Sequence, residues 1–419
     1  MNAKMKTLVT AAAMAAAIAA EAAVSVSNVV CTQQYPWNGK VDIDYEVFAD
    51  DPAADVWVYA TGFDKDANVS MGVRAISGDG ANAPVKPGKH RMTWDVTSDY
   101  PGFNSTAFTV KMTALTGGAP YMVVDLSGGV DALNYPVSYL SSVPAGGWTD
   151  EYKTTKLVLR LIPPGTFMMG SPSDELGGND DSPLTYETLH HVSITKPFYI
   201  GVFEITQKQW QLVMDDTPSQ YKGDVRPVER VSYNMIRGTV NGAAWPTHNQ
   251  VDANSFMGRL RSKVNMLFDL PTEAQWEYSC RAGTSTALNS GKNLTGTQNC
   301  TNMAEVGRYS GNQNDGKGGY NGQHTKVGSY LPNSWGIYDM HGNIGEWCLD
   351  RSFTQPGSNS VIDPKGPTSG SYGDYRTYRG GSWSQNSARC RSAARIGLYV
   401  YPNGTEHNRG FRVVCLPAE

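Results

Sequence analysis

The sequence predicts a multidomain, β-rich protein in which a small antiparallel β-sandwich precedes a larger domain with long ordered loops. Length is the first observation behind this prediction, because 419 residues suffice for two or three domains of roughly 100–200 residues each. Composition is the second. The chain has 44 glycines, 23 prolines and 22 tyrosines, whereas charged residues make up only 18%. This balance favours strands and turns over helical bundles.

Charge and hydropathy limit the classes of partner. The formal net charge is −4, which creates no field that would attract phosphate backbones or anionic lipids. We therefore expect no nucleic acid among the partners. Beyond the N-terminus, no stretch approaches the about 20 apolar residues that a membrane-spanning helix needs. We therefore expect no membrane insertion.

Residues 1–22 are typical of a secretory signal peptide. Lys4 and Lys6 precede the apolar run LVTAAAMAAAIAA, which ends in small residues around Ala22. A basic region, a short apolar region and a small-residue cleavage site are the three features of such a segment. The alternative is an alanine-rich N-terminal helix. We expect cleavage after Ala22 and a mature protein that is secreted or periplasmic/extracellular.

Residues 23–117 show the period-2 alternation of half-buried strands, which predicts an antiparallel β-sandwich. The alternating segments are VDIDYEVFA (41–49), DVWVYATG (55–62) and TAFTVKMTAL (106–115). This unit shows no cluster of metal ligands or acid/base pairs, so we expect an accessory or attachment role. Residues 118–154 are rich in Gly, Pro and Ser around one short apolar piece, which indicates a linker or a packed connecting segment.

Six motifs follow one another in the rest of the chain. They are LIPPGTFMMGS (161–171), HVSITKPFYIGVFEITQKQWQLVM (191–214), RPVERVSYN (226–234), LPTEAQWEYSCRAGT (270–284), VGSYLPNSWGIYDMHGNIGEWCLD (327–350), and YRGGSW with RSAARIG and GFRVV (378–414). In this order they resemble the formylglycine-generating enzyme, or sulfatase-modifying factor, family over residues of about 155–419. The resemblance implies an α+β domain related to C-type lectins, with little regular secondary structure.

Two of the motifs also predict helices from local chemistry. Thr206 precedes an apolar face that includes Trp210 and Val213, and is placed to cap a helix. Thr272 and Gln275 have the spacing of a capping box, which predicts a second helix that ends at Gly283.

The GNIGEW motif is a candidate calcium site. The resemblance implies that Asn343, the Ile344 carbonyl and Glu346 contribute oxygen ligands, which Ca²⁺ prefers. The alternative is an ion pair between Glu346 and an arginine such as Arg412. Four arginines in all stand among apolar and glycine neighbours, and buried pairing with carboxylates or carbonyls explains them; recognition of an anionic group is the other interpretation. They are Arg379, Arg391, Arg395 and Arg412.

Cys390 is the candidate catalytic residue. Active members of the resembled family oxidise a target cysteine with O₂, using copper held by two thiolates five residues apart after a Gly-Gly-Ser turn. Counting from Gly381 and Ser382 places Cys390 at the second thiol and Gln385 at the first. Counting from RSAAR instead moves Cys390 off both positions, so the pair is incomplete in either case. An amide is a poor ligand for Cu(I), so copper is not expected.

The cysteines also allow disulfides. An exported protein with six cysteines is compatible with full pairing, and the number of connectivities prevents assignment from sequence. Cys348 and Cys390 both lie in core motifs of one domain, so we predict a disulfide between them. A buried free thiol and a metal or redox role for Cys390 are the alternatives.

The C-terminal segment predicts a binding surface. Its residues are of types that binding loops favour: Trp383, Tyr399, Tyr401, Asn403, His407 and Asn408. We therefore expect a family member without oxidase activity that binds a protein or cell-surface ligand. The alternatives are an active enzyme that converts a sulfatase cysteine to formylglycine, a retroelement-diversified ligand-binding protein, and a structural envelope component.

Overall fold

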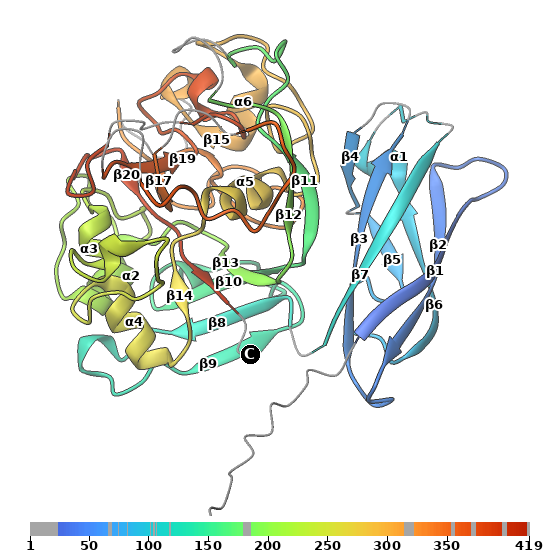
Figure 1. Cartoon of the computed structure of the whole chain (residues 1–419), viewed down its shortest axis with the longest axis horizontal. Coiled ribbons are helices and arrows are strands. Elements are labelled where there is room, and N and C mark those ends of the chain that lie inside the picture. Colours follow the sequence, from blue (N-terminus) through green and yellow to red (C-terminus); the bar gives the residue numbers. More distant parts are fainter. Residues whose placement is uncertain are drawn as a thin grey trace, which may run out of the picture.

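The chain forms two units, which Figure 1 shows beside one another. The computed structural model describes residues 24–65, 69–73, 75–81, 83–100, 102–103, 105, 107–116, 119–178, 186–313, 322–352, 357–369, 374–395 and 400–416. The predicted signal peptide, residues 1–22, lies outside these ranges. Within them, no helix combines the length and apolar character needed to cross a membrane.

The N-terminal unit consists of two antiparallel sheets around one buried cluster. The four-stranded sheet has the order β1-β2-β6-β5 and the three-stranded sheet the order β4-β3-β7. In β2 the residues alternate between buried and partly exposed, as the sequence pattern predicts, and Val41, Ile43 and Trp94 are fully buried. The elements are β1 (Val24–Gln33), β2 (Lys40–Ala49), β3 (Val56–Asp64), β4 (Val69–Gly72), β5 (Ile76–Gly78), β6 (Gly88–Asp95), α1 (Val96–Asp99) and β7 (Phe108–Thr116).

The large domain is built on a six-stranded sheet that includes two strands of the predicted linker. Its order is β14-β21-β13-β10-β8-β9. The prediction of a linker over residues 118–154 therefore needs correction, because β8 pairs with β10 along five residues and β9 extends the sheet. The strands are β8 (Tyr121–Asp125), β9 (Val137–Leu140), β10 (Lys156–Ile162), β13 (Phe198–Gly201), β14 (Phe268–Asp269) and β21 (Val414–Cys415).

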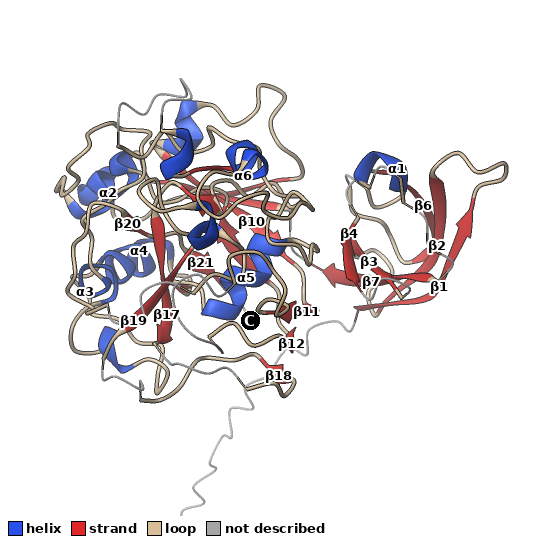
Figure 2. Ribbon diagram, turned by 90° about the horizontal axis from the view of Figure 1, so that it is seen from above, coloured by secondary structure: helices blue, strands red, loops and turns tan. Residues whose placement is uncertain are grey.

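Short strands, short helices and long loops complete this domain (Figure 2). Its other strands are β11 (Gly165–Met169), β12 (His190–Ile194), β15 (Gly307–Arg308), β16 (His341–Gly342), β17 (Gly345–Arg351), β18 (Val361–Ile362), β19 (Arg376–Arg379) and β20 (Arg409–Gly410). Its α-helices are α2 (Gln207–Met214), α3 (Tyr233–Arg237), α4 (Phe256–Val264), α5 (Glu273–Arg281) and α6 (Thr301–Val306). Its 3-10 helices cover Gly129–Asp131, Asp150–Lys153, Gly242–Ala244, Ser310–Asn312 and Ser387–Cys390. The domain consists mostly of strands and loops with few helices, which agrees with the predicted low content of regular secondary structure.

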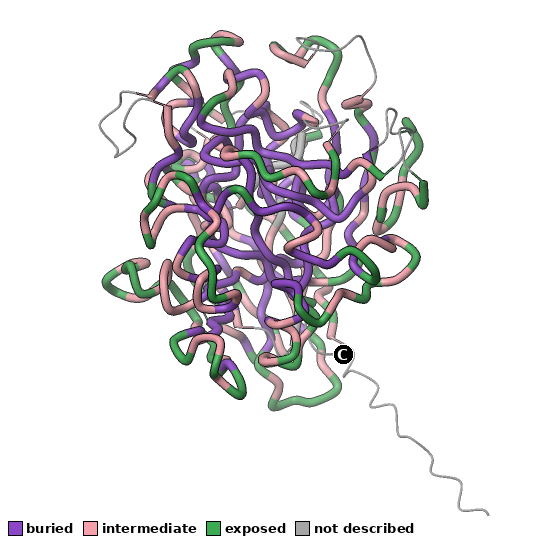
Figure 3. The backbone as a smooth tube through the Cα atoms, turned by 90° about the vertical axis from the view of Figure 1, so that its left-hand side faces the viewer, coloured by how far each residue is buried: buried purple, intermediate pink, exposed green. Residues whose placement is uncertain are grey.

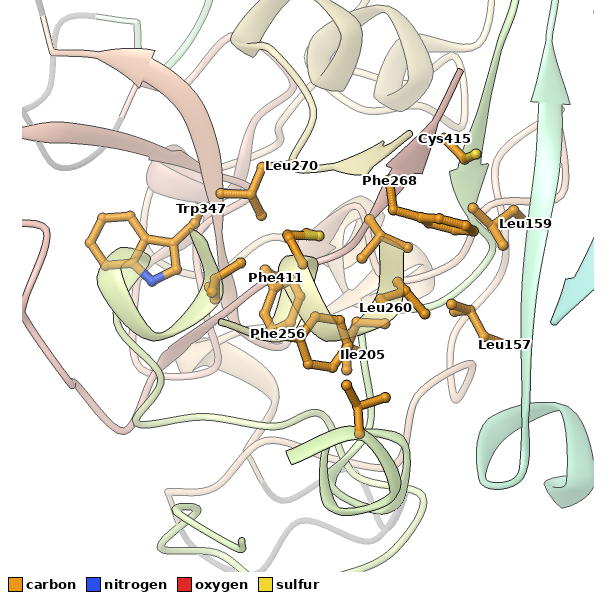
Figure 4. Packing of buried hydrophobic residues seen from close by; sticks show 14 of the residues in the cluster. Leu157, Leu159, Ile205, Phe256, Leu260, Phe268, Leu270, Trp347, Phe411 and Cys415 are labelled. Atoms are coloured by element: carbon orange, nitrogen blue, oxygen red, sulfur yellow. The ribbon is translucent and has the colours of Figure 1, made fainter. Parts of the chain in front are cut away.

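The main core lies between the six-stranded sheet and helices α2 and α4. Figure 4 shows side chains from distant segments, among them Leu157, Phe256, Trp347 and Phe411, that meet there. Buried segments are concentrated in the middle of the domain and exposed segments at its periphery (Figure 3). The loops at the periphery can therefore vary while the core stays packed.

The two predicted helix caps are confirmed. The Thr206 and Thr272 side chains each accept a hydrogen bond from the backbone N–H three residues later, and each site forms a complete capping box. The helix that Thr272 opens ends at Arg281, with Ala282 in a left-handed conformation just before Gly283.

The prediction of buried arginine pairing is confirmed as well. Arg379 contacts Glu273 and Glu277, and Arg395 pairs with Glu273. The Arg391 guanidinium pairs with Glu175 and Glu187, whereas Arg412 pairs with Glu346. These pairs join segments that are far apart in the sequence, and they hold the loops of the domain together.

Candidate functional site

A Gly-Gly-Ser turn after β19 packs against Cys390. Gly380 and Gly381 have φ values of 91° and 72°, in the left-handed region that favours glycine. A Cβ atom at Gly381 would lie 2.5 Å from the Cys390 sulfur. The turn therefore needs glycine, and it closes directly over the thiol.

The Cys390 thiol is not placed for catalysis. The residue is 0% exposed, and its sulfur lies 3.9 Å from the Ser382 carbonyl oxygen. Burial raises the pKa of Cys390 to about 12, so the thiol stays protonated and lacks the thiolate character that a nucleophile or copper ligand needs. The backbone carbonyl of Cys390 accepts a hydrogen bond from His341 Nδ1 at 2.6 Å, which fixes the segment further.

Gln385, which the count from Gly381 and Ser382 predicts at the first thiol position, is held by local contacts. Its N–H donates to the Ser382 carbonyl at 3.0 Å, and its carbonyl accepts from the Ser310 N–H at 2.9 Å. Its side-chain oxygen accepts from the Ser382 hydroxyl at 3.3 Å. A buried thiol beside a neutral amide does not fit Cu(I), which soft thiolate pairs bind.

The predicted disulfide between Cys348 and Cys390 is not formed. All six cysteines, each within the described residues, are free thiols. The two belong to different buried clusters, one with Trp276 and Ile337 and the other with Leu288 and Tyr309. Although both cysteines lie in core motifs of one domain, the fold therefore places them in different parts of its interior. The alternative, an inert buried thiol, describes Cys390 here.

Two of the three candidate calcium ligands, Glu346 and Asn343, are engaged in protein contacts through their side chains. Both Glu346 oxygens accept from Arg412 at 2.6 Å, and Oε2 also accepts from Trp276 Nε1 at 2.7 Å. The Asn343 amide oxygen accepts from the Thr325 N–H at 2.9 Å, and its amide nitrogen donates to Glu204 at 2.6 Å.

Glu204 also holds the backbone next to Asn343. The Ile344 N–H donates to Glu204 Oε1 at 3.1 Å. Among the described residues, no group of three or more His, Cys, Asp or Glu side chains is placed to hold a metal. Glu346 thus forms the predicted alternative, the ion pair with Arg412, and a calcium site at this motif stays a prediction.

A cluster of four rings forms the candidate binding site. Tyr221 lies at its centre, with its ring 5.7 Å from that of His324, 5.8 Å from that of Trp383 and 6.0 Å from that of His407. The Trp383 and His407 rings are 5.5 Å apart. We call these four residues the aromatic cluster. It joins the loop after α2, the segment before β16 and the C-terminal segment.

The aromatic cluster borders several buried polar atoms that have no hydrogen-bond partner among the described residues. They are Trp383 Nε1, both ring nitrogens of His324, and Glu229 Oε2. Glu229 and His324 are fully buried, and His324 Nε2 lies 3.8 Å from Glu229 Oε1. Burial lowers the pKa of His324, so its ring is neutral near neutral pH and offers one donor and one acceptor.

The predicted binding residues divide into two groups. Trp383 and His407 meet in the aromatic cluster, and Asn408 lies beside them, with its side chain donating to Ser384 at 3.1 Å. Tyr401 is 62% exposed and packs edge-on against Tyr375, with the ring centres 4.6 Å apart. Asn403 is exposed on the same loop, and Tyr399 lies outside the described residues.

Sequence reasoning missed Tyr221, His324 and Glu229. Tyr221 lies in the loop TPSQYKGD, and His324 in the loop GQHTK. Both loops lack the periodicity that marks a helix or strand. No pattern within either segment signals that more than 100 intervening residues bring the two rings together, so only the structure reveals the full aromatic cluster.

These features define a loop-rich α+β domain that carries its candidate ligand contacts on long loops around a Gly-Gly-Ser turn. The family model described as the sulfatase-modifying factor enzyme 1-like domain matches residues 149–416, more than half of the chain. The chain therefore belongs to this family.

Several relatives of known name are similar to this chain. A chaperone protein LppX of Paenibacillus barcinonensis is 30% identical over 247 residues, which cover 52% of this chain and 79% of that protein. A formylglycine-generating enzyme of Mus musculus is 27% identical over 293 residues, which cover 62% of this chain and 74% of that protein. An inactive C-alpha-formylglycine-generating enzyme 2 of Bos taurus is 24% identical, covering 66% and 94%.

Similar solved structures include the Treponema denticola variable protein 1 and PvdO from Pseudomonas aeruginosa. The first has a TM-score of 0.47 and 26% identity, and covers 62% of this chain and 96% of its own. The second has a TM-score of 0.47 and 25% identity, and the match covers 62% of this chain and 94% of PvdO.

Proposed function

We propose that this chain is an exported binding protein of the sulfatase-modifying factor family that has no copper-dependent oxidase activity. The observation that carries the proposal is the state of Cys390. Its thiol is fully buried, its pKa is raised to about 12, and Gln385 stands where a second thiolate is needed. Copper oxidation of a substrate cysteine requires both sulfurs.

The aromatic cluster supports binding in place of oxidation. Binding sites combine rigid aromatic surfaces with a few well-placed polar groups, and the partly exposed rings of Tyr221 and His407 supply such a surface. The names of two relatives, a chaperone and an inactive enzyme, fit a protein that binds without oxidising. The ligand class we propose is a protein or another component of the cell surface.

The N-terminal unit completes the proposal as an attachment module. It has a hydrophobic core of its own, with Trp94 and Met92 fully buried. Its described residues contain no group of three or more side chains that would hold a metal. Such a unit can position the large domain without taking part in ligand recognition.

Copper binding and thiol state test the loss of oxidase activity. We expect the purified full-length mature protein to bind no stoichiometric Cu(I) and to leave the mass of a sulfatase peptide with its target cysteine unchanged. Alkylation of the native protein should leave Cys390 unmodified, and alkylation after unfolding without reductant should modify all six cysteines. Conversion of the peptide by the wild type would overturn the proposal.

A binding assay tests the positive half of the proposal. We expect labelled protein to bind intact cells or isolated envelopes saturably, and a His407→Ala variant to bind at least about tenfold more weakly, because ring contacts often dominate an interface. Tyr139→Ala is the matched control, since Tyr139 is a half-exposed aromatic residue of β9, outside the aromatic cluster. Equal binding by both variants would exclude the aromatic cluster as the ligand surface.

A further inference from the structure

A cavity of about 270 Å³ lies between the N-terminal unit and the large domain. Strand β3 of the N-terminal unit provides one wall with Trp57 and Tyr59, and the large domain provides the other with Tyr121, Arg160 and Trp335. The lining is therefore aromatic on both sides. It is separate from the aromatic cluster, and nothing in the proposed function requires it.

Arg160 is the one charged residue among the described residues that line the cavity. It lies on β10, and its guanidinium group stacks over the Tyr121 ring at 4.9 Å. Its Nη1 donates to the Pro120 carbonyl at a long 3.4 Å. Within the described part of the chain, its guanidinium contacts are this carbonyl and the Tyr121 ring, with no ion pair to an Asp or Glu, and its Nε has no hydrogen-bond partner.

This situation differs from that of three buried arginines of the core, whereas a fourth, Arg376, donates to the carbonyls of Trp245, Leu349 and Ala243. Arg379, Arg391 and Arg412 each pair with a carboxylate, because a guanidinium group removed from water is costly without an anion. Arg160 has the aromatic contact but not the anion. The domain junction therefore leaves one positive charge to be neutralised.

Tyr59 adds a second polar group without a partner. Its hydroxyl oxygen is buried and has no hydrogen-bond partner among the described residues. The neighbouring Tyr199 shows the normal arrangement, because its hydroxyl donates to the Ala119 carbonyl at 3.0 Å. Burial raises the pKa of Tyr59 to about 12, so its hydroxyl is a donor at neutral pH.

We propose that this cavity binds a small organic monocarboxylate, whose anionic group pairs with Arg160 and accepts a hydrogen bond from Tyr59. One positive charge matches one carboxylate, whereas a phosphate dianion would remain half neutralised. The Trp57 and Trp335 side chains provide apolar contacts for the body of the ligand. The cavity is slightly smaller than those of drug-sized ligands, which begin at about 300 Å³, so the ligand is compact.

A ligand in this position contacts both units at once. It ties β3 to β10, and its binding should therefore stabilise the arrangement of the N-terminal unit against the large domain. Because the ligand binds the folded, joined state, it should raise the unfolding temperature as its concentration rises above Kd.

The test uses benzoate as the probe and the full-length mature protein. Thermal unfolding and calorimetric titration are followed with benzoate, with benzamide as the neutral analogue and with inorganic phosphate, at constant ionic strength. We expect benzoate to raise the unfolding temperature saturably and benzamide to have no effect. Arg160→Met should weaken benzoate binding by about tenfold or more, since a charged partner is lost.

Tyr59→Phe and Tyr199→Phe form a matched pair of single-oxygen deletions. Tyr59→Phe should weaken benzoate binding by about threefold to tenfold, while Tyr199→Phe should leave the affinity unchanged. Tyr59→Phe alters no packing volume, so it carries the test if Arg160→Met fails to fold. No response of the wild type to benzoate, an unchanged affinity in Tyr59→Phe, or a response to phosphate alone would overturn the assignment.

Discussion

Removal of the Arg412 side-chain charge should strongly destabilise the large domain. The Arg412 guanidinium group is fully buried and makes two hydrogen bonds of 2.6 Å to Glu346. It makes two more to the carbonyls of Gly201 and Tyr338, at 2.9 Å and 2.8 Å. In Arg412→Met all four are lost, and Glu346 keeps only the Trp276 N–H as a nearby donor.

The magnitude follows from the charges left behind. Breaking a buried ion pair by removal of one partner costs about 3–5 kcal/mol. Arg412 also favours the charged forms of Glu204 and Asp339, whose pKa values burial raises, that of Asp339 to about 6. We therefore expect at least that cost, which corresponds to a fall in Tm of about 6–20 °C for a domain of this size.

Removal of the Glu346 charge should destabilise the domain less than removal of the Arg412 charge. In Glu346→Gln the amide oxygen still accepts from Trp276, and Arg412 keeps two carbonyl partners and the neighbouring Glu204 and Asp339. The double variant should be less destabilised than the sum of the single variants, because the two side chains are in direct contact. Arg91→Met is the matched control, since Arg91 forms a similar two-bond pair with Asp44 on the surface and should change Tm little.

Thermal and urea unfolding at pH 7 measure these effects, and calcium provides the test that could refute the reasoning. If the ion pair holds this region, neither EDTA nor added Ca²⁺ should change the Tm of the wild type. If EDTA lowers the Tm, Ca²⁺ restores it and Glu346→Gln abolishes that response, Glu346 is a calcium ligand and the ion-pair account is wrong.

Two further predictions concern pH and domain boundaries. Burial raises the pKa of Asp350 to about 7, and the nearby Glu273 carboxylate raises it further. The native state therefore keeps this proton to a higher pH than the unfolded chain does. The stability that the proton contributes is lost as the pH rises from about 4 through 7. Asp350→Asn should thus gain about 2.7 kcal/mol relative to the wild type between pH 5 and pH 8, because about two pH units of this window lie below the native pKa of about 7. An equal difference in urea unfolding at both pH values would contradict this. A chain that starts at residue 119 should fold, whereas one that starts at residue 155 should not, because it lacks Met122 and Val124, both fully buried; circular dichroism and size exclusion distinguish the two.

Local features of this fold were predictable because their causes lie within a few residues. Thr206 and Thr272 cap helices through contacts that span three positions, and the sequence spacing alone specifies them. The alternation in residues 41–49 predicts β2 for the same reason. The predicted pairing of buried arginines also held, since a guanidinium group among apolar neighbours has few other ways to be accommodated.

Long-range features were not predictable in this way. Strand β8 is buried on both faces, from Tyr121 to Val124, so it lacks the alternation that marks a half-buried strand, and the surrounding glycines and prolines suggested a linker. The disulfide prediction was wrong because it, too, depended on contacts between segments that are far apart in the sequence. Compartment and cysteine count make a bond chemically possible, but only packing decides whether Cys348 and Cys390 meet.

The aromatic cluster shows why the functional surface is the hardest part to predict. Trp383 and His407 were predicted from residue type in one segment, but their contacts to Tyr221 depend on how three loops cross. Charged side chains position two of those loops, because the Tyr221 N–H donates to Glu229 at 2.8 Å and the His324 carbonyl accepts from Arg226. A scaffold fixed by buried charge can therefore change its surface residues without losing its fold. This separation would let a domain keep the family's motifs while the residues of its loops change.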